Sequence, residues 1–598
     1  MDTGESLANL SAAIDLLRGD LLAAERAARL DERGLHPAHR LGAANLVHYL
    51  ALRRHDIREL QAQLARLGLS SLGRAEAHVL ASVEQVGAVL AALAAGRSLA
   101  PPDHPAAVTY DEGRLRLERN AEAALGPEPA GRTTRILVTL PSAAAVEPGL
   151  AAELIARGMD CARINCAHDG PAAWAAMVAN VRAAASAAGR PCPIEMDLGG
   201  PKLRTAGLDS QPGVVKVRPA RDRFGRVTAP GELWLLPAGG QAPAPEAAWI
   251  PVPGAWLAGL RRGDQIRLRD ARGKRRQLHV AEVAAGRARL ETESTAYLVE
   301  GTELGAAHGA CAVAALPPAT RPLVLRAGDR LTLAAAGSGP RRIGCTLPEV
   351  IDDLRPGQRV WFDDGKIGCV VVSGRPGEAE LEVTAAARAG TRLRAEKGIN
   401  LPDTDIDIAA VTPQDEAVLP FVAAHADLVG LSFVRRAADI RGLQERLARL
   451  GAAQVGLVLK IETAEAFTRL PELMLAAMAD ARVAVMIARG DLAVECGWER
   501  LAEVQEEILW LAEAAHLPVI WATQVLDTLA RTGQPSRAEI TDAAMSQRAE
   551  CVMLNKGPYI LTAVATLDDI LCRMSGHQEK KSARLRQLQS WPSAWAPP

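Results

Sequence analysis

The spacing of apolar residues changes near residue 130. Up to about residue 125, apolar side chains recur at helical intervals, most clearly in 57–67 and 75–93. From Arg135 onward, short runs of β-prone residues alternate with Ala-rich helical segments, which is typical of parallel β/α units. The pattern therefore predicts an all-α extension over residues 1–130 and an α/β fold after it.

Eight of the β-prone runs are strand candidates, and most lead into helical segments such as 148–157 and 501–515. The eight runs are 135–140, 161–165, 194–197, 428–433, 456–461, 483–488, 519–523 and 551–554. The third run leads instead into a long stretch of another character. Without that stretch, residues 131–206 and 398–577 have about the length of a (β/α)8 TIM barrel, roughly 250 residues. We therefore expect such a barrel with an insertion after its third strand.

The insertion, residues 207–397, is rich in Gly and Pro and contains alternating strand patterns with few helical stretches. It predicts an inserted β-barrel domain. The sequences LRRGD at 260–264 and LRPGQ at 354–358 each precede a strand pattern, at an offset of 94 residues, which indicates an internal duplication. The alternative is that this motif is only a common turn of small barrels. Residues 578–598 follow the barrel as a tail.

Composition narrows the possible functions. The chain has 598 residues with 69 Lys and Arg against 70 Asp and Glu, so no chain-wide positive field attracts nucleic acid. Its nine cysteines form no C-x-x-C pair, which is typical of a reduced protein. The first residues lack a signal-peptide pattern, and no run approaches the ~18 apolar residues of a membrane span. We expect a cytoplasmic protein with no nucleic-acid partner and no membrane span.

Polar residues follow the predicted strands at one end of the barrel. In such barrels ligands bind at the carboxyl ends of the strands, so these residues should meet on one rim. They are Arg163, Asn165 and His168 after the second strand, Asp197, Lys202 and Arg204 after the third, Lys460 and Glu462 after the fifth, Gly490 and Asp491 after the sixth, and Thr523 after the seventh. Their placement at the same end of successive strands argues against chance.

These residue types suit an anionic substrate that carries phosphate. Glu462 and Asp491 could share a Mg²⁺ ion with substrate oxygens, because that ion typically takes one or two protein carboxylates. Arg163, Arg204 and Lys460 would neutralise the charge of a transferring phosphoryl group. The rim could therefore bind metal and phosphate together.

Each motif also has a simpler interpretation. A Lys-x-Glu after a strand is usually a surface ion pair, and Asp363-Asp364-Gly365 is a good hairpin turn. His168 is more often a structural hydrogen-bonding residue than a ligand. Gly490 allows close approach of the backbone, and the amides before the predicted turn at 492–495 could hold a carboxylate. Only the coincidence of these motifs on one rim favours a site.

Ten segments resemble those of the pyruvate kinase family, in the family's order and over about 410 residues. They are TRILVTLPSA (134–143), GMDCARINCAHDG (158–170), MDLGGPKLRTAG (196–207), WFDDGKI (361–367), KGINLP (397–402), LSFVRRAADI (431–440), LKIETAEAF (459–467), VMIARGDLAVE (485–495), PVIWATQVLDTL (518–529) and PSRAEITDAAM (535–545). From this resemblance, the chain is identified as a member of that family.

The resemblance implies transfer of the phosphoryl group of phosphoenolpyruvate to ADP, which gives pyruvate and ATP in glycolysis. Glu462 and Asp491 match the family's ligands for Mg²⁺ or Mn²⁺. Lys460, Arg163 and Thr523 match its catalytic residues: the lysine that stabilises the transferring group, the phosphate-binding arginine and the threonine near which the enolate is protonated. The implied substrate-binding residues are Arg163, Lys460, Gly490, Asp491 and Thr523, and the implied nucleotide-side or ion-side contacts are Asn165, His168 and Arg204. The inserted domain is similar to the family's lid, with Asp363 or Asp364 facing the site.

Two departures from the family concern a monovalent ion. The family usually holds potassium with the counterparts of Asn165, Asp197 and a serine, but Ala167 stands at the serine position. Lys202 stands where potassium-using members have glutamate, and lysine is found there in members that need no potassium. An ammonium that reached the vacated site would supply the same charge, so we expect that potassium is not required.

Other departures from the family concern the segment after the eighth strand and the two ends of the barrel region, and the functions of these parts stay open. After the eighth predicted strand, the family's Leu-Ser-Gly-Glu-Thr-Ala becomes Leu554-Asn555-Lys556-Gly557-Pro558-Tyr559, which puts substrate choice there in doubt. The resemblance ends with the barrel, so we expect a variant without the family's C-terminal regulatory domain. The N-terminal extension has three open roles: to mediate oligomerisation, to dock a partner or to cover the bottom of the barrel. A homo-oligomer therefore stays an open expectation.

Two alternatives to an active pyruvate kinase also stay open. One is a related phosphotransferase that uses phosphoenolpyruvate with a different acceptor. The other is a catalytically weak barrel that senses metabolites.

Overall fold

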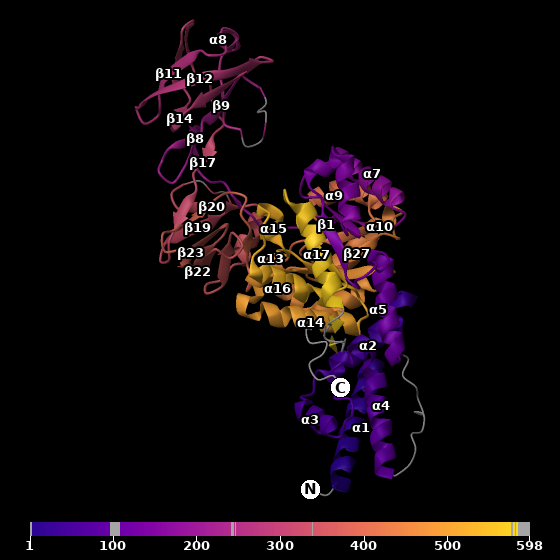
Figure 1. The fold of residues 1–598 in the computed structure, drawn as a ribbon. Helices are drawn as coiled ribbons and strands as arrows, with labels where there is room; N and C mark the ends of the chain where they lie inside the picture. Colours follow the sequence, from indigo (N-terminus) through magenta and orange to yellow (C-terminus); the bar gives the residue numbers. More distant parts are fainter. Residues whose placement is uncertain are drawn as a thin grey trace, which may run out of the picture. The chain divides into compact units, whose positions relative to one another are not determined.

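The computed structural model describes residues 3–95, 108–240, 244, 247–335, 337, 339–575, 578–579 and 582–583. The chain forms two compact units (Figure 1). The barrel unit comprises Met1–Leu203, Asp353–Gly368 and Gly398–Pro598, and the inserted unit comprises Arg204–Asp352 and Cys369–Lys397. The inserted unit thus differs from the predicted insertion, 207–397, chiefly because Asp353–Gly368 belongs to the barrel unit.

The barrel unit contains a closed ring of eight parallel strands, which confirms the predicted (β/α)8 barrel. In order around the ring these are β1 (Arg135–Thr139), β2 (Cys161–Asn165), β3 (Ile194–Asp197), β26 (Leu428–Leu431), β27 (Gly456–Ile461), β28 (Val483–Ala488), β29 (Val519–Ala522) and β30 (Cys551–Leu554). The runs at 428–433 and 519–523 end earlier than predicted. Phe433 has φ +54° and Thr523 has φ +62°, so the chain leaves the extended conformation at both rim positions.

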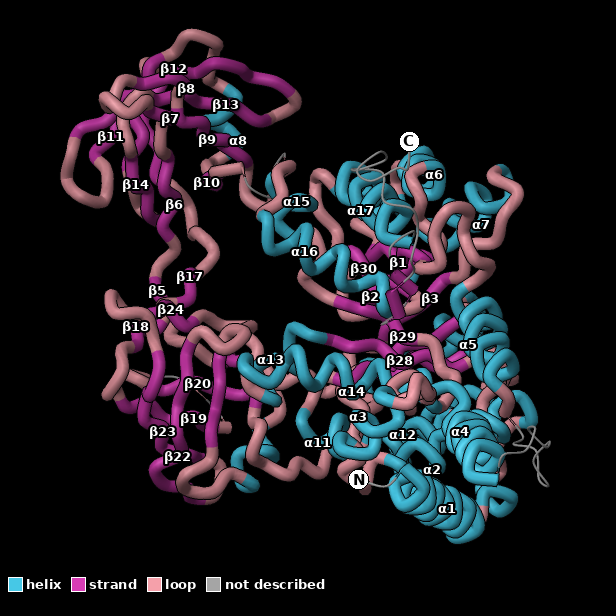
Figure 2. The backbone as a smooth tube through the Cα atoms, turned by 60° about the horizontal axis from the view of Figure 1, so that its bottom comes forward, coloured by secondary structure: helices cyan, strands magenta, loops and turns pink. Residues whose placement is uncertain are grey.

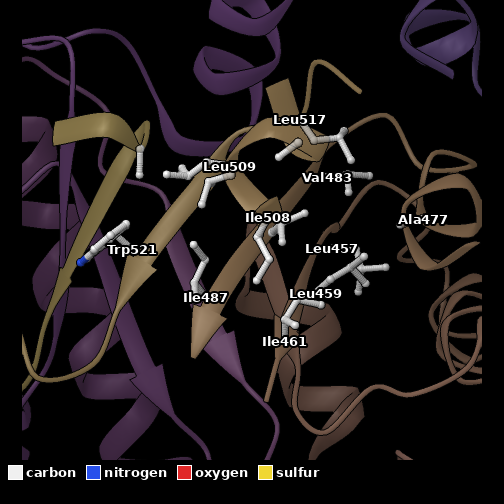
Figure 3. Packing of buried hydrophobic residues seen from close by; sticks show 14 of the residues in the cluster. Leu457, Leu459, Ile461, Ala477, Val483, Ile487, Ile508, Leu509, Leu517 and Trp521 are labelled. Carbon is white, nitrogen blue, oxygen red and sulfur yellow. The ribbon is translucent and has the colours of Figure 1, made fainter. Parts of the chain in front are cut away.

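Helices cover the outside of the ring (Figure 2). They are α6 (Pro148–Ala156), α7 (Pro171–Ala187), α9 (Pro413–His425), α10 (Ala437–Arg449), α11 (Ala464–Thr468), α12 (Leu470–Ala477), α13 (Arg489–Cys496), α14 (Leu501–Ala514), α15 (Asp527–Thr532), α16 (Arg537–Met545) and α17 (Ile560–Ser575). Alternate strand residues pack against them: Leu457, Leu459 and Ile461 lie in one cluster with Ile508 and Leu509 of α14 (Figure 3). The intervening residues face the barrel interior, where they form a separate cluster.

The predicted N-terminal helical region is present in the barrel unit. It contains α1 (Thr3–Ala28), α2 (Arg40–Leu52), α3 (Arg58–Arg66), α4 (Val79–Ala95) and α5 (Tyr110–Leu125). The segment Glu76–Ala95 is long and apolar enough to cross a membrane by length and composition alone. However, α4 contacts α1 and α2, and its Val79, Val83 and Leu90 are fully buried. This helix is therefore part of the hydrophobic core.

The N-terminal helices cover the bottom of the barrel, one of the three roles left open by the sequence. Leu125 at the end of α5 belongs to the interior cluster of the barrel, and its carbonyl accepts a hydrogen bond from Cys161 Sγ at 2.9 Å. Asn45 Nδ2 donates to the carbonyl of Ala514 at 2.8 Å, and His516 Nε2 lies 2.8 Å from the carbonyl of Ala77. Cys161 is the first residue of β2, and Ala514 and His516 precede β29, so all three lie at the end opposite the predicted rim.

The inserted unit has its own core and its own sheets. One seven-stranded sheet has the order β10 (Trp249–Pro251), β9 (Gly231–Leu236), β13 (Arg287–Thr292), β12 (Arg275–Ala284), β11 (Gln265–Arg269), β15 (Glu303–Ala306) and β16 (Gly309–Ala312). Other strands follow in the order β23 (Glu378–Ala385), β19 (Arg330–Ala334), β20 (Arg342–Cys345) and β4 (Thr205–Ala206). Leu233, Ile266, Leu278 and Leu290 are buried on one face of the first sheet.

The motif that indicated a duplication forms the same turn three times. Gly263, Gly328 and Gly357 all have φ between +85° and +93°. In each turn a backbone N–H of arginine donates to the side chain three residues later, at 2.7 to 2.8 Å. The turn at Gly328 lies outside the predicted offset of 94 residues. The turn alone is therefore no evidence of duplication. However, the order β10-β9-β13 of the first sheet recurs as β20-β19-β23 in the second, with a parallel first pair and an antiparallel second pair in both, which favours the predicted duplication.

Candidate functional site

The predicted rim residues of β2, β3 and β27 meet around the ammonium group of Lys460. In β27, the alternation that points Leu459 and Ile461 toward the helices points Lys460 into the barrel. Lys460 Nζ lies 2.6 Å from Ser432 Oγ, 3.1 Å from Asp197 Oδ2 and 3.4 Å from Glu462 Oε1. Burial opposes its charge, but the neighbouring carboxylates outweigh this effect and raise the pKa of Lys460. The buried lysine is therefore a fixed positive charge.

Arg163 shares the same carboxylate. Its Nε donates to Asp197 Oδ2 at 2.9 Å, its Nη2 also donates to that oxygen, and its Nη1 donates to Thr139 Oγ1 at 2.9 Å. Burial alone would raise the pKa of Asp197, but the charges of Arg163 and Lys460 hold it below its ordinary value. One aspartate is thus the shared counter-charge of two buried cations.

Lys202 forms an ion pair with Asp491. The sequence had suggested instead that its ammonium reaches the vacated potassium site. Its Nζ is 2.9 and 3.2 Å from the two carboxylate oxygens of Asp491. Asn400 Nδ2 also approaches Asp491 Oδ1, at 3.4 Å. Asp491 stands in the first turn of α13, and the predicted turn at 492–495 is part of this helix. A carboxylate in the first turn is favoured by the helix dipole.

Glu462 and Asp491 have the chemistry of a divalent-cation site. Glu462 Oε2 accepts a hydrogen bond from the Phe433 amide at 2.6 Å, which fixes the carboxylate. Burial raises the pKa of Glu462, and the negative charge of Asp491 raises it further. The charges of Lys460 and Lys202 lower it, but by less, so the pKa stays above its ordinary value. The two carboxylates therefore repel each other, and a cation between them would relieve this repulsion. Among the described residues, no group of three or more His, Cys, Asp and Glu could hold a metal ion. Glu462 and Asp491 supply two carboxylates, and Mg²⁺ typically takes one or two from a protein.

Thr523 and Gly490 form the neighbouring part of the rim. The Gly490 amide donates to Thr523 Oγ1 at 2.9 Å. Arg489 supports this contact: its guanidinium lies 4.9 Å from the Trp521 ring centroid, and its Nε donates to the Ala522 carbonyl at 2.9 Å. Asp542 pairs with the same guanidinium. The threonine is thus held in its positive-φ conformation by the first turn of α13 and the end of β29.

Of the three predicted nucleotide-side residues, Asn165 and His168 make local contacts after β2, and Arg204 lies in the inserted unit. Asn165 Oδ1 accepts from the Ala167 amide at 3.0 Å and shapes the turn after β2. His168 is exposed, and its carbonyl accepts from Trp174 Nε1. Arg204 belongs to the inserted unit, where its guanidinium donates to the Glu396 carbonyl at 3.3 Å. Asp363 and Asp364 form the expected tight turn, with φ +53° and +55°, inside the barrel unit.

Two residues of the site were missed from the sequence. Ser432 directly follows β26 and contacts Lys460, so the rule used for the other rim residues would have found it. Glu195 lies beneath Asp197 in β3, and neither of its carboxylate oxygens has a hydrogen-bond partner among the described residues. Burial, with the charge of Asp197, raises the pKa of Glu195 to about 8. Its only signal was an acidic residue inside a buried strand.

Comparison with known proteins gives the family of this barrel. Residues 320–564 match the family model described as pyruvate kinase, barrel domain, a range that includes Lys460, Glu462, Asp491 and Thr523. This part of the chain is therefore a barrel of the pyruvate kinase type. The chain is 35% identical over 250 residues to a pyruvate kinase of Mycobacterium intracellulare, covering 41% of this chain and 51% of the relative. It is 31% identical over 278 residues to a pyruvate kinase of Geobacillus stearothermophilus, covering 44% of this chain and 46% of the relative. The chain thus spans about half the length of these curated relatives.

Proposed function

We propose that this protein is a pyruvate kinase-type phosphotransferase, which moves the phosphoryl group of phosphoenolpyruvate to ADP. One observation carries the proposal: Lys460, Arg163 and the carboxylates of Glu462 and Asp491 lie together at the carboxyl ends of the strands. The relatives that match this barrel are pyruvate kinases. A rim with fixed cations beside two carboxylates suits the phosphate and carboxylate groups of such a substrate.

The chemistry follows from the charges of these residues. The bond between phosphorus and the enol oxygen breaks, a bond to a terminal oxygen of ADP forms, and the enolate takes a proton at carbon to give pyruvate. Lys460 and Arg163 would neutralise the transferring group, and a divalent cation on Glu462 and Asp491, when bound, would supply further positive charge. Asp197 holds both cations in place. We assign Thr523, whose hydroxyl is fixed by the Gly490 amide, to the protonation step.

We also propose that the activity does not require potassium. Ala167 supplies no hydroxyl ligand, and Asp197 is already neutralised by Arg163 and Lys460. Lys202 adds a second ammonium beside Asp491. A many-fold rise in activity when potassium replaces sodium or tetramethylammonium would contradict this proposal.

The test of the main proposal is a coupled assay of pyruvate formation from phosphoenolpyruvate and ADP with Mg²⁺. We expect turnover in the wild type and its loss in Lys460→Met, because the buried ammonium cannot be replaced by an apolar side chain. Lys216→Met, which removes a lysine of the inserted unit, is the matched control and should keep wild-type turnover. Absence of wild-type turnover with any nucleoside diphosphate would reject this function.

A different acceptor is the second candidate, favoured by the segment after β30. Lys556 is exposed there, and Gly557 packs so closely that a Cβ would lie 2.3 Å from the Ala530 carbonyl oxygen. This close packing fixes the backbone of the loop, and the loop carries the cation Lys556 directly after β30. Assays of phosphoenolpyruvate with a panel of nucleoside diphosphates and other phosphate acceptors separate this candidate from the first. A failure of all acceptors, with phosphoenolpyruvate still bound, would leave the metabolite-sensing alternative.

A further inference from the structure

The sheet of the inserted unit has a hollow of about 690 Å³ on one face. The polar residues that line it are Arg267, Arg269, Arg275, Arg276, Gln277 and Glu303. The arginines come from the neighbouring strands β11 and β12, and the single carboxylate comes from β15. The lining of the hollow is thus strongly cationic.

Strand register places these arginines side by side. In the antiparallel pair of β11 and β12, Arg269 lies opposite Arg275 and Arg267 lies opposite Gln277. Gly305 of β15 lies opposite Arg267 on its other side, so no side chain covers this part of the face. Ile266 and Leu268 alternate with the arginines and point into the core, which leaves Arg267 and Arg269 exposed. Directly opposed like charges destabilise a sheet.

Nearby carboxylates do not balance this charge. Within the part of the chain that the structure describes, Arg267 and Arg275 form no ion pair, and Arg269 donates only to the Gly273 carbonyl at 3.4 Å. Asp270 pairs with Arg276 and with Arg272 in the adjacent turn. The guanidinium donors of Arg267 and Arg275 are therefore available to another molecule, and so are most of those of Arg269.

Other arginines of the same unit are matched with carboxylates. Arg289, on the neighbouring strand β13, pairs with Glu232, Glu282 and Glu291. Arg330 on β19 pairs with Glu380 and with a second glutamate across the same sheet. The inserted unit as a whole has 26 Lys and Arg against 18 Asp and Glu. Arginines of this unit are thus paired with glutamates on β13 and β19, whereas those at the hollow on β11 and β12 contribute unbalanced positive charge.

We propose that this hollow binds a small ligand that carries two or more phosphate groups. Guanidinium groups form paired, charge-assisted hydrogen bonds with phosphate oxygens. Adjacent strands lie about 5 Å apart, so arginines on β11 and β12 can hold successive phosphates of one ligand. The volume falls within the range of small-molecule sites. No aromatic side chain lines the hollow, so it lacks the stacking surface that single-stranded nucleic acid uses.

Inorganic triphosphate is the probe that tests this site on the full chain. Calorimetric titration measures its Kd, and hydrogen exchange reports protection of the backbone over 261–280. We expect binding in the wild type and at least about tenfold weaker binding in the double variant Arg267→Ser/Arg275→Ser, because two charge-assisted contacts are lost. The matched control is Arg289→Ser/Arg330→Ser, which removes the same charge from paired positions and should change the Kd by less than about twofold.

Phosphate can also bind at the rim of the barrel, so the titration is repeated in Lys460→Met. Protection of 261–280 should persist in that variant. Equal weakening by the two double variants would reduce the effect to net charge and overturn the proposal. Triphosphate binding without protection of 261–280 would overturn it as well. A single-stranded RNA of about 20 nucleotides is the last competitor. If it bound more tightly than triphosphate and displaced triphosphate from the hollow, the hollow would be part of a polyanion-binding surface and the proposal of a small-ligand site would be wrong.

Discussion

The barrel unit and the inserted unit use charge in opposite ways. Outside the inserted unit, the chain has 43 Lys and Arg against 52 Asp and Glu, whereas the inserted unit has 26 against 18. At the rim of the barrel, the cations Arg163, Lys460 and Lys202 each contact a carboxylate. On β11 and β12 of the inserted unit, arginines face each other instead. Buried charge is organised in the barrel by pairing, whereas exposed charge on the sheet stays available to ligands.

The largest effect should come from the carboxylate that balances two cations. In Asp197→Asn, the buried Arg163 and Lys460 lose their shared counter-charge, which typically costs about 3–5 kcal/mol of folding free energy. Turnover should fall by more than about a hundredfold, because both cations lose their positions. Urea unfolding and the pyruvate assay measure the two effects. The exposed Asp407→Asn is the control, and an equal loss of stability there would contradict the comparison.

The next largest effect concerns the N-terminal helices as part of the barrel unit. Leu125 is buried in the barrel interior, so Leu125→Ala should lower the free energy of unfolding by about 2–5 kcal/mol. Leu115→Ala, on the same helix but 42% exposed, should change it by less than about 1 kcal/mol. Thermal unfolding of both variants checks this. Equal, small effects would mean that the helices are not part of the barrel core.

A smaller effect depends on pH. Burial lowers the pKa of His516 to about 4, whereas the unfolded imidazole titrates near about 6.5. Between these two pH values the unfolded state binds a proton that the folded state does not. The contribution of His516 to the free energy of unfolding is therefore complete above about pH 6.5 and is lost as the pH falls toward 4. The slope from this group is at most about 1.4 kcal/mol per pH unit. His516→Asn should flatten this slope in urea titrations, and an unchanged slope would rule out His516 as its source.

The smallest expected effect has the opposite sign. Arg269→Glu would place a carboxylate opposite Arg275 in place of a like charge, and should stabilise the sheet by about 0.5–1 kcal/mol. Arg289→Glu is the matched variant and should destabilise it, because this position faces three glutamates. Chemical denaturation of both variants gives the comparison. If both were destabilising, the arginines of β11 and β12 would have a structural role.

The strands were predictable because they are apolar on both faces and rich in β-branched residues. Phe433 and Thr523 were assigned to strands wrongly, since their positive φ is set by contacts at the rim that no local pattern encodes. Rim residues were predictable because parallel strands bring their carboxyl ends together. The partner of Lys202 was not, because its flexible side chain selects among several carboxylates that only the fold brings within reach.

Barrel closure also sets an order on folding. Strands β3 and β26 are hydrogen-bonded neighbours, Glu195 beside Leu428, although the whole inserted segment separates them along the chain. Bringing distant strands together has an entropic cost that grows slowly with the length between them, and it slows the formation of such pairs. The other strand junctions from β26 to β30 join close neighbours in sequence. The most distant junction is that of β1 with β30, the last of the eight strands to be synthesised, so during synthesis the ring should close last between these two strands.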